Sequence, residues 1–111
     1  MATVSNLFVD AGASYSNIIS VAATNGQPLN LTGYSVASQM RKSYQSSTSY
    51  NFTSSIYLAA SGKVRLQLTD VQSASIPAGR WLYDVEITSP SGTKTRVVEG
   101  VVTVNPQITQ I

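Results

Sequence analysis

The chain has 111 residues, only 11% of them charged, and a formal net charge of +2. It contains no cysteine and no histidine, which excludes disulfide bridges, thiolate metal sites and the commonest catalytic base. Its seven basic residues are dispersed along the chain, whereas nucleic-acid binders usually carry a clustered basic face. We therefore expect no nucleic-acid partner. The length fits one domain over residues 1–111.

Serine and threonine fill 28 of the 111 positions and take the place of charged residues. Because a surface with few charges repels its neighbours weakly, this composition favours a protein packed among other subunits. An ordinary β domain with a hydroxyl-rich surface fits it equally well. The N-terminal residues lack the features of a secretory signal, and no apolar run reaches the roughly 18 residues of a membrane span. We expect no membrane partner.

The first half of the chain predicts short strands separated by turns. The strand-like segments are residues 4–9, 15–22, 34–41 and 50–58. The dipeptide Asn25-Gly26 predicts a tight turn, since both residue types tolerate positive φ. The polar, serine-rich residues 42–49 predict a loop.

Residues 63–69 alternate most regularly, with Val64, Leu66 and Leu68 on the inner face. The segment that follows predicts a short helical turn near residues 70–76. Thr69 can cap it and Pro77 ends it. We expect Val71 and Ile76 to fold this turn over the core.

Residues 78–104 predict a β-hairpin. One face of its first strand is apolar and aromatic, and its loop lies at Ser89–Gly92. The inner residues of that strand are Trp81, Tyr83, Val85 and Ile87. The predicted register sets Ser89 against Thr93, Glu86 against Arg96 and Val85 against Val97. Because it also sets Glu99 against Tyr83, we expect a corrective bulge near Glu99-Gly100.

Together these patterns predict an all-β fold of about seven or eight strands with one short helical turn near residues 70–76. Such spacing is typical of an antiparallel β-sandwich, either immunoglobulin-like or jelly-roll-like.

The sequence offers little catalytic chemistry. Asp84 and Glu86 leave the same face of a strand, where two carboxylates can act as an acid/base pair or help to hold a hard cation. We favour a solvated strand face that is paired with Arg96 and Lys94. None of the serines has a histidine or a recognisable lysine motif beside it to activate it. We therefore predict no catalytic, cofactor-binding or metal-binding residue, no cofactor and no enzymatic activity.

The aromatic residues divide into two groups. Trp81 and Tyr83 alternate with apolar partners and are expected in the core. Tyr44 and Tyr50 flank the polar loop and are candidates for a contact surface.

Four segments carry a resemblance to a known group of proteins. They are "LTGYSVASQMRKS" (31–43), "KVRLQLT" (63–69), "IPAGRWLYDVEITSPSG" (76–92) and "RVVEGVVTVNP" (96–106). Together they resemble small β-sandwich virion structural proteins of tailed bacteriophages, most closely those of T4-like phages of cyanobacteria. They are more loosely similar to the N-terminal domains of baseplate upper proteins and tail-fibre proteins. Similar domains tend to carry tyrosine at the position of Trp81.

This resemblance implies a structural role in a virus particle that is assembled in the host cytoplasm, with other virion proteins as partners. It leaves open a capsid decoration protein or a tail, neck, baseplate or fibre-attachment subunit, present as a homo-oligomer or in many copies. We expect the apolar ends of the chain, residues 4–9 or 106–111, to dock on neighbouring subunits. The candidate contacts are Val4, Leu7, Phe8, Tyr44, Tyr50, Ile108 and Ile111. The alternative is a receptor- or glycan-binding β-sandwich module.

Overall fold

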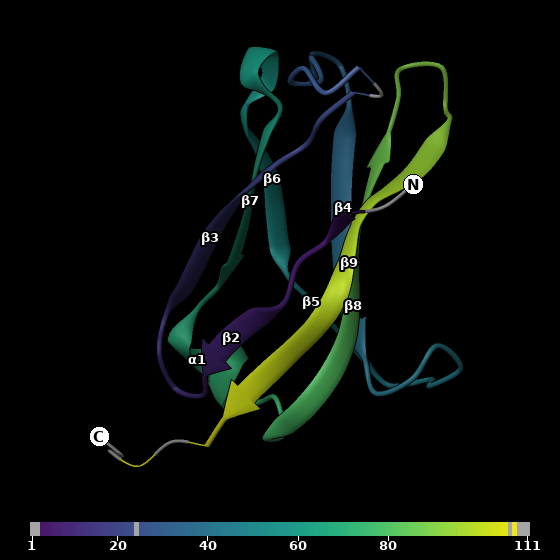
Figure 1. The fold of residues 1–111 in the computed structure, drawn as a ribbon. Helices are drawn as coiled ribbons and strands as arrows, with labels where there is room; N and C mark the ends of the chain where they lie inside the picture. The colour runs from purple at the N-terminus through teal and green to yellow at the C-terminus, as the bar shows by residue number, and fades with distance from the viewer. Residues whose placement is uncertain (1–2, 24, 107, 109–111) are drawn as a thin grey trace.

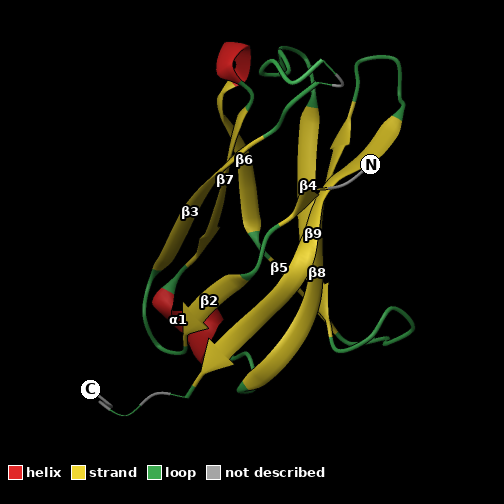
Figure 2. Ribbon diagram, in the orientation of Figure 1, coloured by secondary structure: helices red, strands yellow, loops and turns green. Residues whose placement is uncertain are grey.

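Two β-sheets face each other in the computed structural model, which describes residues 3–23, 25–106 and 108 (Figures 1 and 2). A 3-10 turn spans Ala59–Ser61, and a single α-helix, α1, spans Asp70–Ala74 among these residues. The strands are β1 (Thr3–Val4), β2 (Leu7–Asp10), β3 (Tyr15–Ser20), β4 (Ser35–Arg41), β5 (Ser49–Asn51), β6 (Thr53–Leu58), β7 (Lys63–Leu68), β8 (Gly79–Thr88) and β9 (Lys94–Asn105). The predicted all-β sandwich is confirmed, with nine strands in the described part of the chain.

The larger sheet has the order β1-β9-β8-β4-β5, with β2 also paired to β9, and the smaller sheet has the order β3-β7-β6. The three central strands of the larger sheet and the three of the smaller sheet follow the order of an immunoglobulin-type sandwich. Of the two expected architectures, the strand order is therefore immunoglobulin-like.

The N-terminal arm departs from the antiparallel expectation, because β1 and β2 both run parallel to β9. Parallel neighbours need a long connection, and here every other strand of the fold lies between the arm and β9 in the sequence. Leu7 and Val9 point into the core, whereas Phe8 between them points outward. Residues 4–9 are thus part of the chain's own sheet.

The core fills the space between the two sheets, and the predicted alternation explains most of it. Val64, Leu66 and Leu68 of β7 are buried, as expected. From the opposite sheet the buried side chains of β8 are Trp81, Tyr83, Val85 and Ile87. The predicted inner faces of β7 and β8 are confirmed.

Residues 50–58, expected to form one strand, belong to two sheets. Phe52 separates β5 from β6, and its backbone N donates to the carbonyl oxygen of Ser38 (3.0 Å). Its ring is buried against Tyr15 and Tyr83, with centroids 6.0 and 6.1 Å away. The chain therefore crosses between the sheets at a buried aromatic residue, which an apolar run does not distinguish from a continuous strand.

Helix α1 begins with a capping box, in which Thr69 accepts from Gln72 N while the Gln72 side chain accepts from Thr69 N. Ile76 is buried, as expected, but Val71 is 75% exposed, so its predicted place over the core was wrong. Ser73 faces the core instead. Its hydroxyl accepts from Gly12 N (3.0 Å) and donates to Ala13 O (2.8 Å).

The β8–β9 hairpin turns at the predicted loop, where Ser89 N donates to Thr93 O, and Glu86 lies opposite Arg96. The bulge, however, falls at Val97. Val85 therefore faces Val98. Glu99 consequently faces Asp84, and Gly100 faces Tyr83.

Candidate functional site: the outer face of the larger sheet

The structure brings three of the expected contact residues onto one surface. Val4 is 67% exposed, Phe8 is 68% exposed and Tyr44 is 74% exposed. Val4 and Phe8 are in register with Glu99 and Thr103, whose neighbours Val98, Val102 and Val104 are buried. Val4 and Phe8 therefore share the outer face of the larger sheet with Glu99 and Thr103.

The other expected contacts fare differently. Leu7 is only 3% exposed and packs in the core, so its side chain is not available to contact a neighbouring subunit. Tyr50 is half-buried against the core, and its ring meets Trp81 edge-on at a centroid distance of 5.3 Å. Ile108 is exposed. Ile111, and with it most of the predicted C-terminal docking segment, lies outside the described residues.

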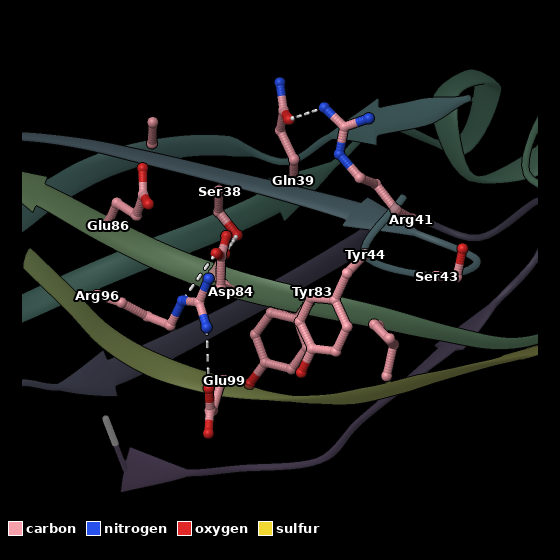
Figure 3. A pocket seen from close by; sticks show the side chains of 12 residues that line it. Ser38, Gln39, Arg41, Ser43, Tyr44, Tyr83, Asp84, Glu86, Arg96 and Glu99 are labelled. Atoms are coloured by element: carbon pink, nitrogen blue, oxygen red, sulfur yellow. Dashed lines mark hydrogen bonds and ion pairs between the residues drawn. The ribbon is translucent and has the colours of Figure 1, made fainter. Parts of the chain in front are cut away.

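A groove of about 330 Å³ runs over the same outer face (Figure 3). Strands β4, β8 and β9 form its floor, and the loop after β4 supplies Ser43 and Tyr44 at its rim. The outward side chains that line the floor are Ala37, Gln39, Leu82, Asp84, Glu86, Arg96 and Glu99.

Arg96 is the electrostatic centre of the groove. Its Nε lies 3.1 Å from Asp84 Oδ2, and its Nη1 lies 3.3 Å from Glu99 Oε1. The nearby Asp84 carboxylate is the main reason that the pKa of Arg96 is raised. The bulge at Val97 brings Arg96 and Glu99, three residues apart, to the same face. The predicted pairing of Arg96 with this acidic face is confirmed, with Asp84 as its partner, whereas the predicted pairing of Lys94 is not found among the described residues.

The loop that carries Tyr44 is held at both of its sides. Arg41 donates through Nη1 to Ser46 O (2.6 Å) and through Nη2 to Gln39 Oε1 (3.1 Å). Lys42 donates to Arg80 O (3.1 Å), and its Nζ lies 4.7 Å from the centroid of the Trp81 ring. These contacts anchor the loop that places Tyr44 at the rim of the groove.

This arrangement does not support an acid/base role for the pair Asp84 and Glu86. Asp84 is engaged by Arg96, and Glu99 is the carboxylate that faces it across the strands. In the described part of the chain, no group of three or more carboxylate, histidine or cysteine side chains is placed to hold a metal ion.

The sequence predicted Tyr44 as a surface residue but missed the groove beside it. The groove depends on the bulge at Val97 and on the hydrogen bonds of Arg41, neither of which has a clear sequence signal. The unfavourable pairing of Glu99 with Tyr83 was the one hint that a bulge was needed.

No family model matches the chain, and a search of curated proteins finds no match. In the described part of the chain we find no helix with the length and hydropathy of a membrane span.

Proposed function

We propose that this protein is a non-enzymatic structural component of a tailed-phage virion, and that it acts through protein–protein contacts made by the outer face of its larger sheet. Its partners in this proposal are other virion proteins of the head, neck, tail, baseplate or fibre attachment. The resemblance of four segments to virion proteins motivates the proposal, and the all-β fold agrees with it.

The observation that carries the proposal is the gathering of exposed apolar groups on this face. Val4 and Phe8 lie at one edge, and Tyr44 stands over the groove. The half-buried Leu82 and Val101, paired across β8 and β9, lie between them. Aromatic side chains of this kind are the usual anchors of protein interfaces.

The energetics of the face favour docking. Covering apolar surface contributes about 25 cal/mol per Å², and the Phe8 and Tyr44 rings are mostly uncovered. Arg96 already pairs with both Asp84 and Glu99, so a partner that covers the three meets one unbalanced negative charge and no unpaired cation. The charged groups therefore oppose burial less than isolated charges do.

The direct test is to purify virions from a phage that encodes this chain and to search for it by mass spectrometry. Immunogold labelling then locates it on the head or the tail. The proposal predicts a stoichiometric protein that remains on particles through density-gradient purification. A protein found only in the soluble lysate would refute it.

One observation favours a second candidate, a glycan-binding module. A sugar ring can stack on Tyr44 while Gln39 and Glu86 in the groove offer polar contacts. Titration with a panel of glycans, followed by the fluorescence of Tyr44→Phe and Tyr44→Ala variants, separates the two candidates. Saturable binding that Tyr44→Ala abolishes would support the module, whereas no binding to any glycan would support the assembly role.

A further inference from the structure

Strand β3 is one of the two edge strands of the smaller sheet. On one side it pairs with β7 along its whole length, and on the other no described strand pairs with it (Figure 1). In an immunoglobulin-type sandwich a first strand commonly lies at that position. Here the N-terminal arm pairs with β9 in the opposite sheet.

The register of β3 shows which backbone groups face this open side. Val21 N donates to Gly62 O (2.8 Å), which continues the ladder that pairs Ile19 with Val64. In an antiparallel ladder, alternate residues direct both their N–H and C=O groups to the same neighbour. Asn17 and Ile19 therefore bond to β7, and the backbone groups of Ser16, Ile18 and Ser20 point to the open side.

The other edges among the described strands are interrupted or short. β5 has three residues, and the edge formed by β1 and β2 is broken between Val4 and Leu7. β6 carries a bulge between Ile56 and Leu58. Such features protect edges from unwanted pairing, as do charged residues and proline. β3 (sequence YSNIIS) has six regular residues with no charge and no proline.

We propose that β3 pairs antiparallel with β3 of a second copy of this chain, about a two-fold axis that passes beside Ile18. In this register Ile18 faces Ile18 of the second copy, and Ser16 faces Ser20. All three pairs are then hydrogen-bonded pairs, because each of these residues has outward N–H and C=O groups. The two smaller sheets become one continuous six-stranded sheet, β6-β7-β3 joined to its symmetry mate.

The side chains around β3 suit a second copy. Ile18 is 45% exposed, so the pairing covers an apolar side chain with its own counterpart. The nearest cation beside Ile18 is Arg65, which lies over the Tyr57 ring at 4.3 Å. The Arg65 residues of the two copies would be three strand spacings apart, about 14 Å, which exceeds the Debye length of about 8 Å at physiological salt. Lys63 donates through Nζ to Ser20 Oγ (2.6 Å), and the two-fold register places the two Lys63 residues at opposite ends of the paired strands. The two edges therefore meet without appreciable repulsion between these cations.

Sedimentation equilibrium of the full chain at concentrations from about 5 μM to 1 mM tests the pairing. Because one strand pair is a small interface, the expected average mass rises with concentration from 11.8 kDa toward twice that value. Amide exchange followed by NMR locates the contact. We expect the amides of Ser16, Ile18 and Ser20 to gain at least tenfold protection at high concentration, whereas those of Asn17 and Ile19 are protected throughout.

Two variants make the test specific. Ile18→Pro removes an amide that the β7 ladder does not use, and Ile18→Lys places two charges at the axis. Both are expected to remain folded and monomeric, whereas the control Val71→Lys, on α1, associates like the unmodified chain. A mass of 11.8 kDa at every concentration, or a dimer without protection at Ser16, Ile18 and Ser20, would overturn the inference. Neither result bears on the proposed function, because the inference does not rest on it.

Discussion

The hydroxyl of Tyr83 donates a hydrogen bond to the backbone carbonyl oxygen of Ser5, 78 positions earlier in the sequence. Ser5 lies at the break between β1 and β2, where its carbonyl oxygen bonds to the Tyr83 hydroxyl. At the same break the Asn6 side chain bonds to the backbone of β9, since its Oδ1 accepts from Val101 N (3.1 Å). The arm that presents Val4 and Phe8 is therefore fixed by side chains as well as by strand pairing.

Replacing Tyr83 with phenylalanine is expected to lower the free energy of unfolding by about 1–2 kcal/mol. The variant keeps the buried ring but leaves the half-buried Ser5 carbonyl without its donor, and an unpaired acceptor in such a place costs about this much. Urea denaturation measures the change. Tyr44→Phe, at an exposed ring, is the matched control and should unfold within about 0.5 kcal/mol of the parent. Equal losses in both variants would contradict this role for Tyr83.

Gly100→Ala is expected to destabilise the protein by about 1–3 kcal/mol and to loosen the arm. A Cβ at this position would overlap the Ser5 carbonyl and press on the Asn6 side chain. Thermal unfolding gives the stability, and amide exchange in β1 and β2 reports the arm. Thr103→Ala, which also alters β9 but faces outward, should leave exchange in the arm unchanged. Unaltered amide exchange in Gly100→Ala would show that the close approach of Ser5 to Gly100 does not hold the arm in place.

The stability of the fold should decrease between pH 10 and pH 12. Burial is the main cause that raises the pKa of Tyr83 from its ordinary 10.0 to about 12, and burial also raises the pKa of Tyr15. Over this interval the unfolded chain releases a proton that folded Tyr83 retains, so rising pH favours unfolding, by at most about 1.4 kcal/mol per pH unit for one group. Below pH 10 this contribution is fully present.

Denaturant unfolding at pH 9, 10, 11 and 12 measures this dependence. The decline should be shallower for Tyr83→Phe than for the parent chain, because the variant lacks the titrating hydroxyl. Absorbance at 295 nm should also show one tyrosine fewer with a midpoint near pH 12. Identical pH profiles for the two proteins would contradict the assignment.

Ser73→Ala is expected to cost about 1–3 kcal/mol. The buried Ser73 hydroxyl joins α1 to the turn after β2, and alanine would leave Gly12 N and Ala13 O without this partner. Ser75, exposed at the end of the same helix, offers the control, since Ser75→Ala removes only a local bond to Gln72 O. Guanidinium unfolding of both variants compares them directly, and a loss for Ser75→Ala as large as that for Ser73→Ala would argue against the bridge.

The regular parts of this fold were predictable because local pattern dictates them. The inner faces of β7 and β8, the capped helical turn and the Ser89–Gly92 loop all depend on alternation, capping or turn chemistry within a few residues. The departures arise from contacts between distant segments. Val71 was expected to face the core because it is apolar, but Ser73 occupies the core-facing position. The Ser73 hydroxyl forms hydrogen bonds with Gly12 and Ala13, some 60 residues away in the sequence.

The candidate site was predictable only in part. Phe8 and Tyr44 were identified as surface residues from composition and position, but nothing local indicated that they share a face. That result needs the parallel pairing of β2 with β9 and the register shift at Val97. Leu7 was misassigned because an apolar run does not reveal which of its residues face inward until the strand's partner is known.

We propose that the outer face of the larger sheet is the assembly surface, and the incorporation of variants into virions tests this proposal most directly. Phe8→Ser and Tyr44→Ser, supplied to a phage that lacks its own copy of the protein, are each expected to be incorporated at least tenfold less than the parent. Val71→Ser, an equally exposed apolar site on α1, should be incorporated normally. If folded Phe8→Ser and Tyr44→Ser enter particles as well as Val71→Ser does, this face is not the assembly surface.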